Sequence, residues 1–188
     1  ARGFSFRSNG PLDMRMGGSE KTAADVVNTA DEKSLADILF NYGEEHAAKR
    51  IAKKIITARS FAPVQTTKQL ADIVHSVLPP HPKLKTDTAT KTFQALRIYV
   101  NDELGELERA LAAAEQILLP HGRLVVVSFH SLEDTRVKNF LRTRAGQEGN
   151  NSRHLPEKAA GQAPTFIIEK KGGLKPSKAE TESNPRAR

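Results

Sequence analysis

The feature that most constrains the fold of this chain is a change in its hydrophobic pattern at residue 123. From residue 123 to 129 the chain reads Arg-Leu-Val-Val-Val-Ser-Phe, a continuous run rich in β-branched residues that follows Gly122. Such a run is typical of a strand that is buried on both faces of a parallel sheet. Helical patterns precede it and follow it, the second over residues 132–142. This order of helix, buried strand and helix predicts an α/β fold.

A second, shorter strand is predicted over residues 165–169. Two strands do not make a stable doubly wound sheet, since sheets commonly have about four to six strands. We therefore expect the other strands to lie upstream of Ala1 or just after Arg188. The sequence also starts without an initiator Met and without an apolar signal region, which indicates a chain entered in mid-protein.

Residues 22–80 carry helical patterns with recognisable start and stop signals. Thr22 and Asp31 are predicted to cap the first two helices, and Gly43 to follow the second. An acidic pair at residues 44–45 would begin the third helix, where the helix macrodipole favours negative charge. The four predicted helices cover residues 22–30, 31–42, 44–59 and 66–78.

The fourth helix is predicted to begin at Thr66 or Thr67 and to stop at Pro79, which cannot continue a helix. A longer helical pattern over residues 93–118 has a predicted break near Asn101 and ends at a Pro-His-Gly turn. The chain therefore holds a small helical unit followed by part of an α/β sheet.

The chain is basic, with 29 Lys and Arg against 22 Asp and Glu and a net charge of +7. Such an excess suggests a polyanionic partner, although many proteins carry it for solubility alone. Part of the excess lies on one face of the predicted third helix, at Lys49, Arg50, Lys53 and Lys54. This face either contacts phosphates or is simply solvated.

The sequence has no cysteine, which excludes disulfides, thiolate metal sites and cysteine nucleophiles within it. Such a composition suits a reducing cytosol, where we expect the protein to act. No apolar run is long enough to span a bilayer, so no membrane partner is expected. The histidines show no paired metal-ligand spacing, and no glycine-rich phosphate loop is present, so we expect no metal site.

The first candidate site is the segment Ser-Phe-His-Ser-Leu-Glu-Asp at residues 128–134, between the predicted strand and a helix N-terminus. Open α/β sheets bind ligands outside the carboxyl ends of their strands. Ser131 and Asp134 could together cap the helix, and this reading competes with a functional one. Such a cap does not need His130. We therefore expect His130 and Asp134 to shape a substrate pocket, with Ser128 and Ser131 beside them.

The second candidate is the turn-rich loop over residues 3–16. Aromatic rings and Arg planes can stack on nucleic-acid bases, and a carboxylate can accept a hydrogen bond from a cytosine amino group. The competing interpretation is a loop pinned by buried Phe and Met side chains. The residues of this loop that could bind a substrate are Phe4, Phe6, Arg7, Asp13 and Arg15.

Four separate motifs cover the chain from end to end. They are residues 3–6 (Gly-Phe-Ser-Phe) with 10–16 (Gly-Pro-Leu-Asp-Met-Arg-Met), 90–98 (Thr-Lys-Thr-Phe-Gln-Ala-Leu-Arg-Ile) with 100–104 (Val-Asn-Asp-Glu-Leu), 122–124 (Gly-Arg-Leu) with 128–134, and 184–188 (Asn-Pro-Arg-Ala-Arg). Together, and in this order, they resemble the ribosomal RNA small subunit methyltransferase H family, also called the MraW family.

The resemblance implies a Rossmann-like class I methyltransferase domain, of α/β class, with an inserted all-α domain. Residues 1–20 would be a loop and edge of the methyltransferase domain, 21–88 the insertion that recognises RNA, and 89–188 its C-terminal part. The implied reaction transfers a methyl group from S-adenosylmethionine to N4 of a cytidine in the decoding region of 16S rRNA, in the small ribosomal subunit. The enzyme would contribute positioning, desolvation and an acceptor for the amino proton.

The sequence departs from the family pattern in what it omits. The family's Gly-rich methyl-donor loop and its acidic ribose-binding residue precede the region matching Ala1, so we expect the donor site to lie mostly outside this chain and the chain alone to be inactive. A final strand after the motif that contains Arg186, a further candidate substrate contact, is also missing. Thr88 stands where the family usually has Pro.

An alternative of another class is a non-catalytic RNA-binding or ribosome-associated module, which the basic helix and basic tail would serve equally well. A further expectation concerns residues 144–164, whose Gly-, Asn- and Pro-rich composition predicts weak order in the absence of RNA.

Overall fold

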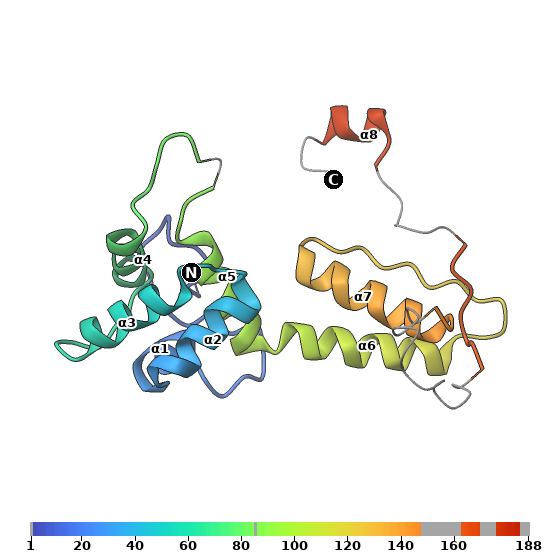
Figure 1. Cartoon of the computed structure of the whole chain (residues 1–188), viewed down its shortest axis with the longest axis horizontal. Helices are drawn as coiled ribbons and strands as arrows, with labels where there is room; N and C mark the ends of the chain where they lie inside the picture. Colours follow the sequence, from blue (N-terminus) through green and yellow to red (C-terminus); the bar gives the residue numbers. More distant parts are fainter. Residues whose placement is uncertain (1, 85, 148–162, 170–175, 185–188) are drawn as a thin grey trace, which may run out of the picture. The chain divides into compact units, whose positions relative to one another are not determined.

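The structure is a computed structural model, and it describes residues 2–84, 86–147, 163–169 and 176–184. The chain divides into two compact units, a first unit of residues Ala1–Leu107 and a second unit of residues Glu108–Arg188. Figure 1 labels the helices of the described ranges, which are α1 (Ala23–Thr29), α2 (Glu32–Gly43), α3 (Ala48–Arg59), α4 (Thr67–Val77), α5 (Thr90–Asn101), α6 (Glu103–Ile117), α7 (Ser131–Arg144) and α8 (Lys178–Ser183).

Local capping signals start α1, α2 and α4, as the sequence predicts. The Thr22 hydroxyl accepts from the Asp25 amide, and the Asp25 carboxylate accepts in return from the Thr22 amide, which makes a capping box. Asp31 accepts from the Ser34 amide at the start of α2. Thr66, rather than Thr67, caps α4. Each cap satisfies amides that the first helical turn leaves without partners.

The predicted start of the third helix at residue 44 is wrong. Glu44 adopts a left-handed conformation with φ of 49° and closes α2, while α3 begins at Ala48. Glu45 is buried, and its carboxylate accepts from the Ala47 amide at 2.9 Å. Gly43 is the last residue of α2 and does not follow it. A Cβ atom at this position would come within 2.6 Å of the Lys91 carbonyl oxygen on α5, which explains why the residue is glycine. This glycine serves the close approach of two helices instead of the helix end.

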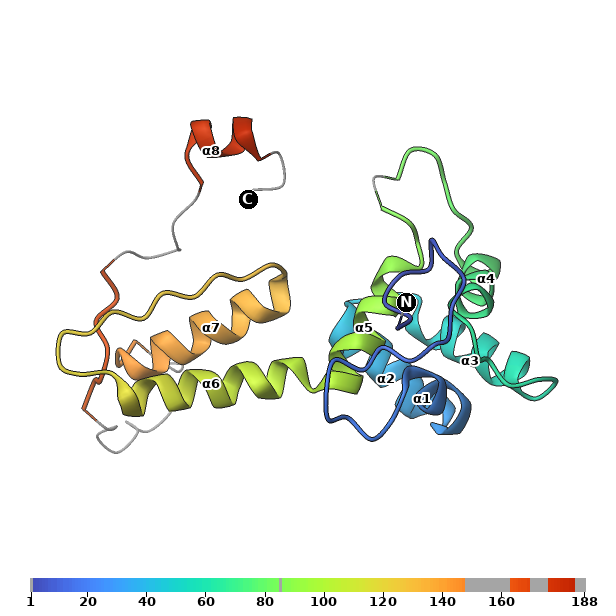
Figure 2. The same cartoon turned by 180° about the vertical axis from the view of Figure 1, so that it is seen from behind.

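The core of the first unit is formed where α2 packs between α3 and α5, with α1 and α4 against α3 and α1 also against α5. Both views show these helices side by side (Figures 1 and 2). Burying each large apolar side chain contributes about 1.5 to 3 kcal/mol, so a core of this size is the main source of stability. Its fully buried side chains include Leu35, Leu39, Ile51, Ile55, Leu70 and Leu96.

The predicted break near Asn101 is confirmed, and it separates α5 from α6. Asp102 adopts a left-handed conformation with φ of 48°, which ends α5. The guanidinium of Arg97 spans the break and donates to both carboxylate oxygens of Glu103, at 2.8 and 2.9 Å. The break is therefore a fixed turn held by a two-bond ion pair.

The second unit has little apolar core in its described part. Leu111 and Val137 are its buried hydrophobic side chains there. Ion pairs link α6 to α7 instead, one between Arg136 and Glu108 and one between the Nε of Arg144 and Glu115 at 2.7 Å. Partly exposed polar contacts are thus prominent in the described part of the second unit, whereas buried aliphatic side chains dominate the first.

The two predicted strands do not form, since the described residues contain no strand. The side chains of residues 123–129 still alternate: Leu124 and Val126 are half-buried, whereas Val125 and Val127 are 80% and 73% exposed. Residues 165–169 alternate in the same way. A strand needs a neighbour to take its backbone hydrogen bonds, and the described part of the chain offers none to either segment.

The last helices also differ from the expectation. Helix α7 begins at Ser131 and runs to Arg144, and the short helix α8 was not predicted from the sequence. Among the described helices, none combines the length and the apolar character that crossing a bilayer requires. Arg186 and most of the segment 144–164 lie outside the described residues.

Candidate functional site

The loop of the second candidate is fixed to the N-terminus of α4. The amide of Thr67 donates to the Gly10 carbonyl at 2.9 Å, and the Gly10 amide donates to the Thr67 hydroxyl at 3.1 Å. That buried hydroxyl donates in turn to the Ser8 carbonyl at 3.0 Å. The Leu12 amide donates to the Gln65 carbonyl. The first half of the loop is therefore held by the start of a packed helix.

Asn101 fixes the second half of the loop. Its side-chain oxygen accepts from the Met16 amide at 2.7 Å, and its side-chain nitrogen donates to the Met14 carbonyl at 2.8 Å. The same nitrogen donates to the Arg97 carbonyl at 2.8 Å. Met14 is fully buried in a left-handed conformation with φ of 63°, which non-glycine residues adopt at a cost of about 1–2 kcal/mol. Asn101 offsets this strain from 87 residues away.

Asp13 and Arg15 form a bidentate pair within this loop. The Nε and one terminal nitrogen of Arg15 donate to the two carboxylate oxygens of Asp13, at 2.7 and 3.0 Å. The hydrogen bond from Arg15 holds the pKa of Asp13 below its ordinary value. Asp13 is thus an ionised acceptor, and 40% of the Arg15 side chain is exposed, so that side chain is partly accessible to a partner.

The aromatic residues of the loop lie in different environments. Phe6 packs edge-to-face on Phe93 with 5.0 Å between ring centroids, so its ring is part of the core. Phe4 is 39% exposed, and the guanidinium of Arg2 lies 5.9 Å from its ring centroid. Arg7 is exposed. Phe4 and Arg7 are therefore accessible to a partner, whereas Phe6 belongs to the loop's structural support.

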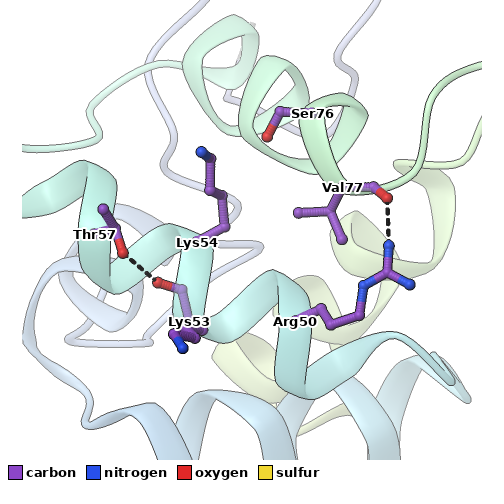
Figure 3. Close-up of a pocket in the computed structure, with 6 residues that line it drawn as sticks. All are labelled: Arg50, Lys53, Lys54, Thr57, Ser76 and Val77. Carbon is purple, nitrogen blue, oxygen red and sulfur yellow. Dashed lines mark hydrogen bonds between the residues drawn. The ribbon is translucent and has the colours of Figure 1, made fainter.

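The predicted basic face lies on α3, and its four side chains are all exposed. Helix α3 contains no acidic residue. Lys53, Lys54 and Thr57 line a hollow of about 370 Å³ together with Arg50 and with Ser76 and Val77 of α4, as Figure 3 shows. The Arg50 guanidinium donates to the Val77 carbonyl at 2.7 Å and so joins the two helices. Lys49 lies on the same helix outside this lining.

The structure assigns the cap of α7 to His130, and not to Ser131 with Asp134. The Nδ1 atom of His130 accepts from the Glu133 amide at 3.4 Å, and the Glu133 carboxylate accepts from the His130 amide at 3.3 Å. The prediction that no cap needs His130 is therefore wrong. Sequence reasoning missed Glu133, although a Glu three residues after a cap is its usual sign. Ser128 is half-buried in the irregular segment before the cap.

The Asp134 amide donates to the His130 carbonyl at 3.1 Å, but the two side chains have different partners. The Nε2 atom of His130 lies 3.3 Å from a carboxylate oxygen of Glu133. The Asp134 carboxylate accepts from Lys138 at 2.6 Å, and 48% of its side chain is exposed. His130 therefore supports the helix start, while Asp134 is the more accessible of the two.

A further pair, His75 with Asp87, was missed by sequence reasoning. The Nε2 atom of His75 lies 2.8 Å from an Asp87 carboxylate oxygen that also accepts from the Ala89 amide. Burial acts to raise the pKa of Asp87, but these hydrogen bonds outweigh it and hold the pKa below its ordinary value. The Thr88 hydroxyl donates to the Leu78 carbonyl at 2.7 Å. The end of α4 and the start of α5 are thereby joined.

The hollow lined by α3 and α4 is not suited to a methyl donor. No cluster of three or more His, Asp or Glu side chains that could hold a metal occurs among the described residues. The hollow on α3 is lined by cationic side chains, which disfavour the sulfonium cation of S-adenosylmethionine by charge repulsion. The lining suits an anion instead.

The similarity to known proteins extends over the whole sequence. The description "MraW methylase family" belongs to the family that matches residues 1–188. A protein of Hyphomonas neptunium named Ribosomal RNA small subunit methyltransferase H is 54% identical over 187 residues, which cover 100% of this chain and 55% of that protein. Proteins of the same name are 54% identical in Methylorubrum populi and in Caulobacter vibrioides, where this chain covers 53% and 60% of their lengths. The chain thus spans between about half and three fifths of these relatives.

Proposed function

The chain belongs to the MraW methylase family, and from this premise we propose that it is part of an S-adenosylmethionine-dependent methyltransferase that modifies N4 of a cytidine in the decoding region of 16S rRNA. The observation that carries the proposal is the match of the whole chain, at 54% identity, to proteins named as ribosomal RNA methyltransferases. The proposed partner is the rRNA within the small ribosomal subunit. We propose that the methyl donor binds mostly in the part of the protein that the relatives possess beyond this sequence.

The surface of the second unit supports an α/β domain that is completed by further chain. The alternating segments over residues 123–129 and 165–169 expose Val125, Val127 and Ile167 to 80%, 73% and 91%. Such apolar faces are costly in water and are typical of strands covered on both sides in a parallel sheet. We propose that in the longer protein both segments pair as strands of a Rossmann-like sheet, whose other strands and second helical layer come from the rest of that protein.

The first unit supports a role in holding RNA. We propose residues 21–88 as the RNA-recognising insertion, with residues 1–20 and 89–188 belonging to the methyltransferase domain. The exposed cations of α3 are the basis for this assignment, because basic surface without acidic partners attracts the phosphate backbone. The loop of residues 10–16 adds an ionised carboxylate and a guanidinium in one fixed arrangement.

Methylation at N4 requires the amino group of the cytosine to be held in place and its departing proton to be accepted. We propose that Asp134 and His130, with Ser128 and Ser131, shape the pocket for the target base. The capping contacts of His130 support a positioning role, since they fix the start of α7 and thereby the direction of the Asp134 side chain. Asp134 itself is held by Lys138 and remains half-exposed.

The test compares this chain with the full-length protein in radiolabelled methyl transfer to small subunits that lack the modification. We expect transfer by the full-length protein and none by the 188-residue chain. Full-length protein that binds small subunits without transferring a methyl group would favour the alternative, a non-catalytic RNA-binding module. A product methylated at another base atom would support methyltransferase activity but contradict N4 of cytidine as the modified position.

A further inference from the structure

The hollow between α3 and α4 has walls of two different kinds. Lys53 and Lys54 contribute ammonium groups, and Figure 3 shows the Lys54 side chain extending from α3 toward the turn of α4 that carries Ser76. Thr57 and Ser76 contribute hydroxyls. The volume of about 370 Å³ is roughly that of ten water molecules. It is large enough for a group with both charged and neutral polar parts.

The two lysines have no ion-pair partner among the described residues, although neighbouring helices do pair their lysines. Lys33 contacts Asp37 at 2.9 Å on α2, and Lys68 contacts Asp72 at 3.0 Å on α4. Helix α3 instead places like charges four residues apart, as in Arg50 and Lys54, and such pairs repel each other along a helix. An anion bound at the hollow would remove this repulsion.

The hydroxyls of the two lining residues Thr57 and Ser76 are both engaged as donors. The Thr57 hydroxyl donates its proton to the Lys53 carbonyl at 2.9 Å, and the Ser76 hydroxyl donates to the Ile73 carbonyl at 2.7 Å. Each hydroxyl oxygen keeps lone pairs after this donation. A phosphodiester, which is only an acceptor, cannot use them. A ligand that combines an anion with a hydroxyl donor would therefore use both the lysines and these hydroxyl oxygens.

We propose that this hollow binds one phosphodiester of an RNA chain together with a neighbouring ribose 2′-hydroxyl. Lys53 and Lys54 contact the phosphate, and the 2′-hydroxyl donates to the oxygen of Thr57 or Ser76. The hydroxyl is the feature by which a protein distinguishes RNA from DNA. This inference rests on the proposed function for its RNA partner, and it adds that α3 and α4 select the sugar as well as the charge.

Arg50 has a separate part in this site. Its bond to the Val77 carbonyl uses one of the last carbonyls of α4, which lack partners within the helix. The bond sets the spacing of the two helices and hence of the ammonium and hydroxyl walls. Arg50 is accordingly a positioning residue of the hollow, whereas Lys53 and Lys54 make the contacts.

The experiment measures binding of the 188-residue chain to a short single-stranded RNA, to DNA of the same sequence and to the 2′-O-methyl RNA, by fluorescence anisotropy at several salt concentrations. The unsubstituted chain should bind RNA about three- to tenfold more tightly than the other two, as one hydrogen bond provides. A Thr57→Val, Ser76→Ala chain should lose this preference and keep its affinity for DNA. A Lys53→Gln, Lys54→Gln chain should bind all three polymers more weakly, with a salt slope smaller by about 0.7, as expected for one phosphate of a single strand.

A matched control removes two cations elsewhere. Lys33→Gln with Lys68→Gln lowers the net charge by the same amount on two other helices, and it should leave affinity and salt slope nearly unchanged. All substituted positions are exposed, and circular dichroism melting curves verify that the helices persist.

Two results would overturn the inference. Equal affinity of the unsubstituted chain for RNA and 2′-O-methyl RNA removes the role of the hydroxyl. Equal losses in the hollow and control variants show that only total charge matters. Neither result touches the proposed function, which depends on methyl transfer by the full-length protein. Conversely, the full-length protein could fail to transfer a methyl group while the chain still prefers RNA through the hollow. That result would contradict the proposed enzyme and support the RNA site.

Discussion

The two units of this chain are stabilised in different ways. In the first unit, large side chains such as Leu39 and Leu96 are fully buried among five packed helices. In the described part of the second unit, Leu111 and Val137 are the buried hydrophobic residues, and partly exposed ion pairs link its two long helices. Exposed ion pairs contribute about 0–1 kcal/mol each, much less than a buried leucine. The difference indicates that the first unit carries its own stability, whereas the second presents surfaces suited to further apolar contacts.

The strongest test of this comparison is a matched pair of core truncations. Leu96→Ala in the first unit should lower the free energy of unfolding by about 3 kcal/mol, since it leaves a cavity in a packed core. Val137→Ala in the second unit should cost about 1 kcal/mol, because Leu111 is the other buried hydrophobic residue in the described part of that unit and the apolar core there is small. Hydrogen exchange with mass spectrometry measures the two units separately. Equal losses of unfolding free energy at the two positions would contradict the difference in stability between the two units.

A smaller effect is expected at Asn101, which links the loop to the first unit's core. Asn101→Ala removes its bonds to Met14 and Met16, and two such hydrogen bonds contribute about 2 kcal/mol. Amide exchange of residues 14–16 should rise strongly, while exchange of α2 and α3 should change little. Asn101→Asp keeps the acceptor for Met16 and should give an intermediate result. Unchanged protection of the loop in the alanine variant would show that other contacts hold it.

The cap of α7 provides a comparison between equivalent features of the two units. His130→Ala should cost about 1 kcal/mol, the usual effect of losing an N-cap, and the loss should appear as faster exchange in the first turn of α7. Thr66→Ala removes the corresponding cap of α4, where a packed core limits local opening. In the full-length enzyme, His130→Ala should lower methyl transfer about ten- to a hundredfold. Normal transfer with faster exchange would make His130 purely structural.

The smallest expected effect is a difference in acid sensitivity. Hydrogen bonds from Thr165 and Arg144 hold the pKa of Glu115 below its ordinary value of 4.5, and Asp87 is held below its ordinary value of 3.8. A lowered carboxyl pKa stabilises the fold above the ordinary value, and this contribution is lost as pH falls through the lowered pKa. The loss begins as pH falls below the ordinary value, which is higher for the glutamate than for the aspartate. The second unit should therefore begin to lose stability at a higher pH than the first.

The measurement follows circular dichroism and hydrogen exchange against pH. Glu115→Gln should flatten the acid response of the second unit, and Asp87→Asn that of the first. An acid response that both substitutions leave unchanged would assign it to other carboxylates.

Much of the first unit could be predicted from the sequence because its signals are local. Thr22 and Asp31 cap helices through atoms three residues away, and the break after Asn101 was visible as a change in pattern. Gly43 was misassigned because its reason is a carbonyl on another helix, at Lys91. The clamp by Asn101 was missed for the same reason, since its partners are 85 and 87 residues away.

The second unit was harder to predict because a strand is not a local structure. The run at residues 123–129 has the composition and the alternation of a strand, but backbone pairing requires other strands. His130 was assigned to a pocket because an imidazole is an unusual cap, whereas the structure uses its Nδ1 atom as the acceptor. The sequence left two roles open for Phe6, a stacking platform or an anchor of the loop, and its packing on Phe93 agrees with the anchor.

The bonds of Asn101 to the loop have a consequence for the order in which the protein is made. A ribosome synthesises the chain from its N-terminus, so residues 14–16 emerge long before Asn101 does. Domains that fold during synthesis leave such early segments exposed until their late partners appear. The loop therefore reaches its final conformation only after most of the first unit has left the ribosome, and until then the buried methionine and its neighbours remain available to chaperones and proteases.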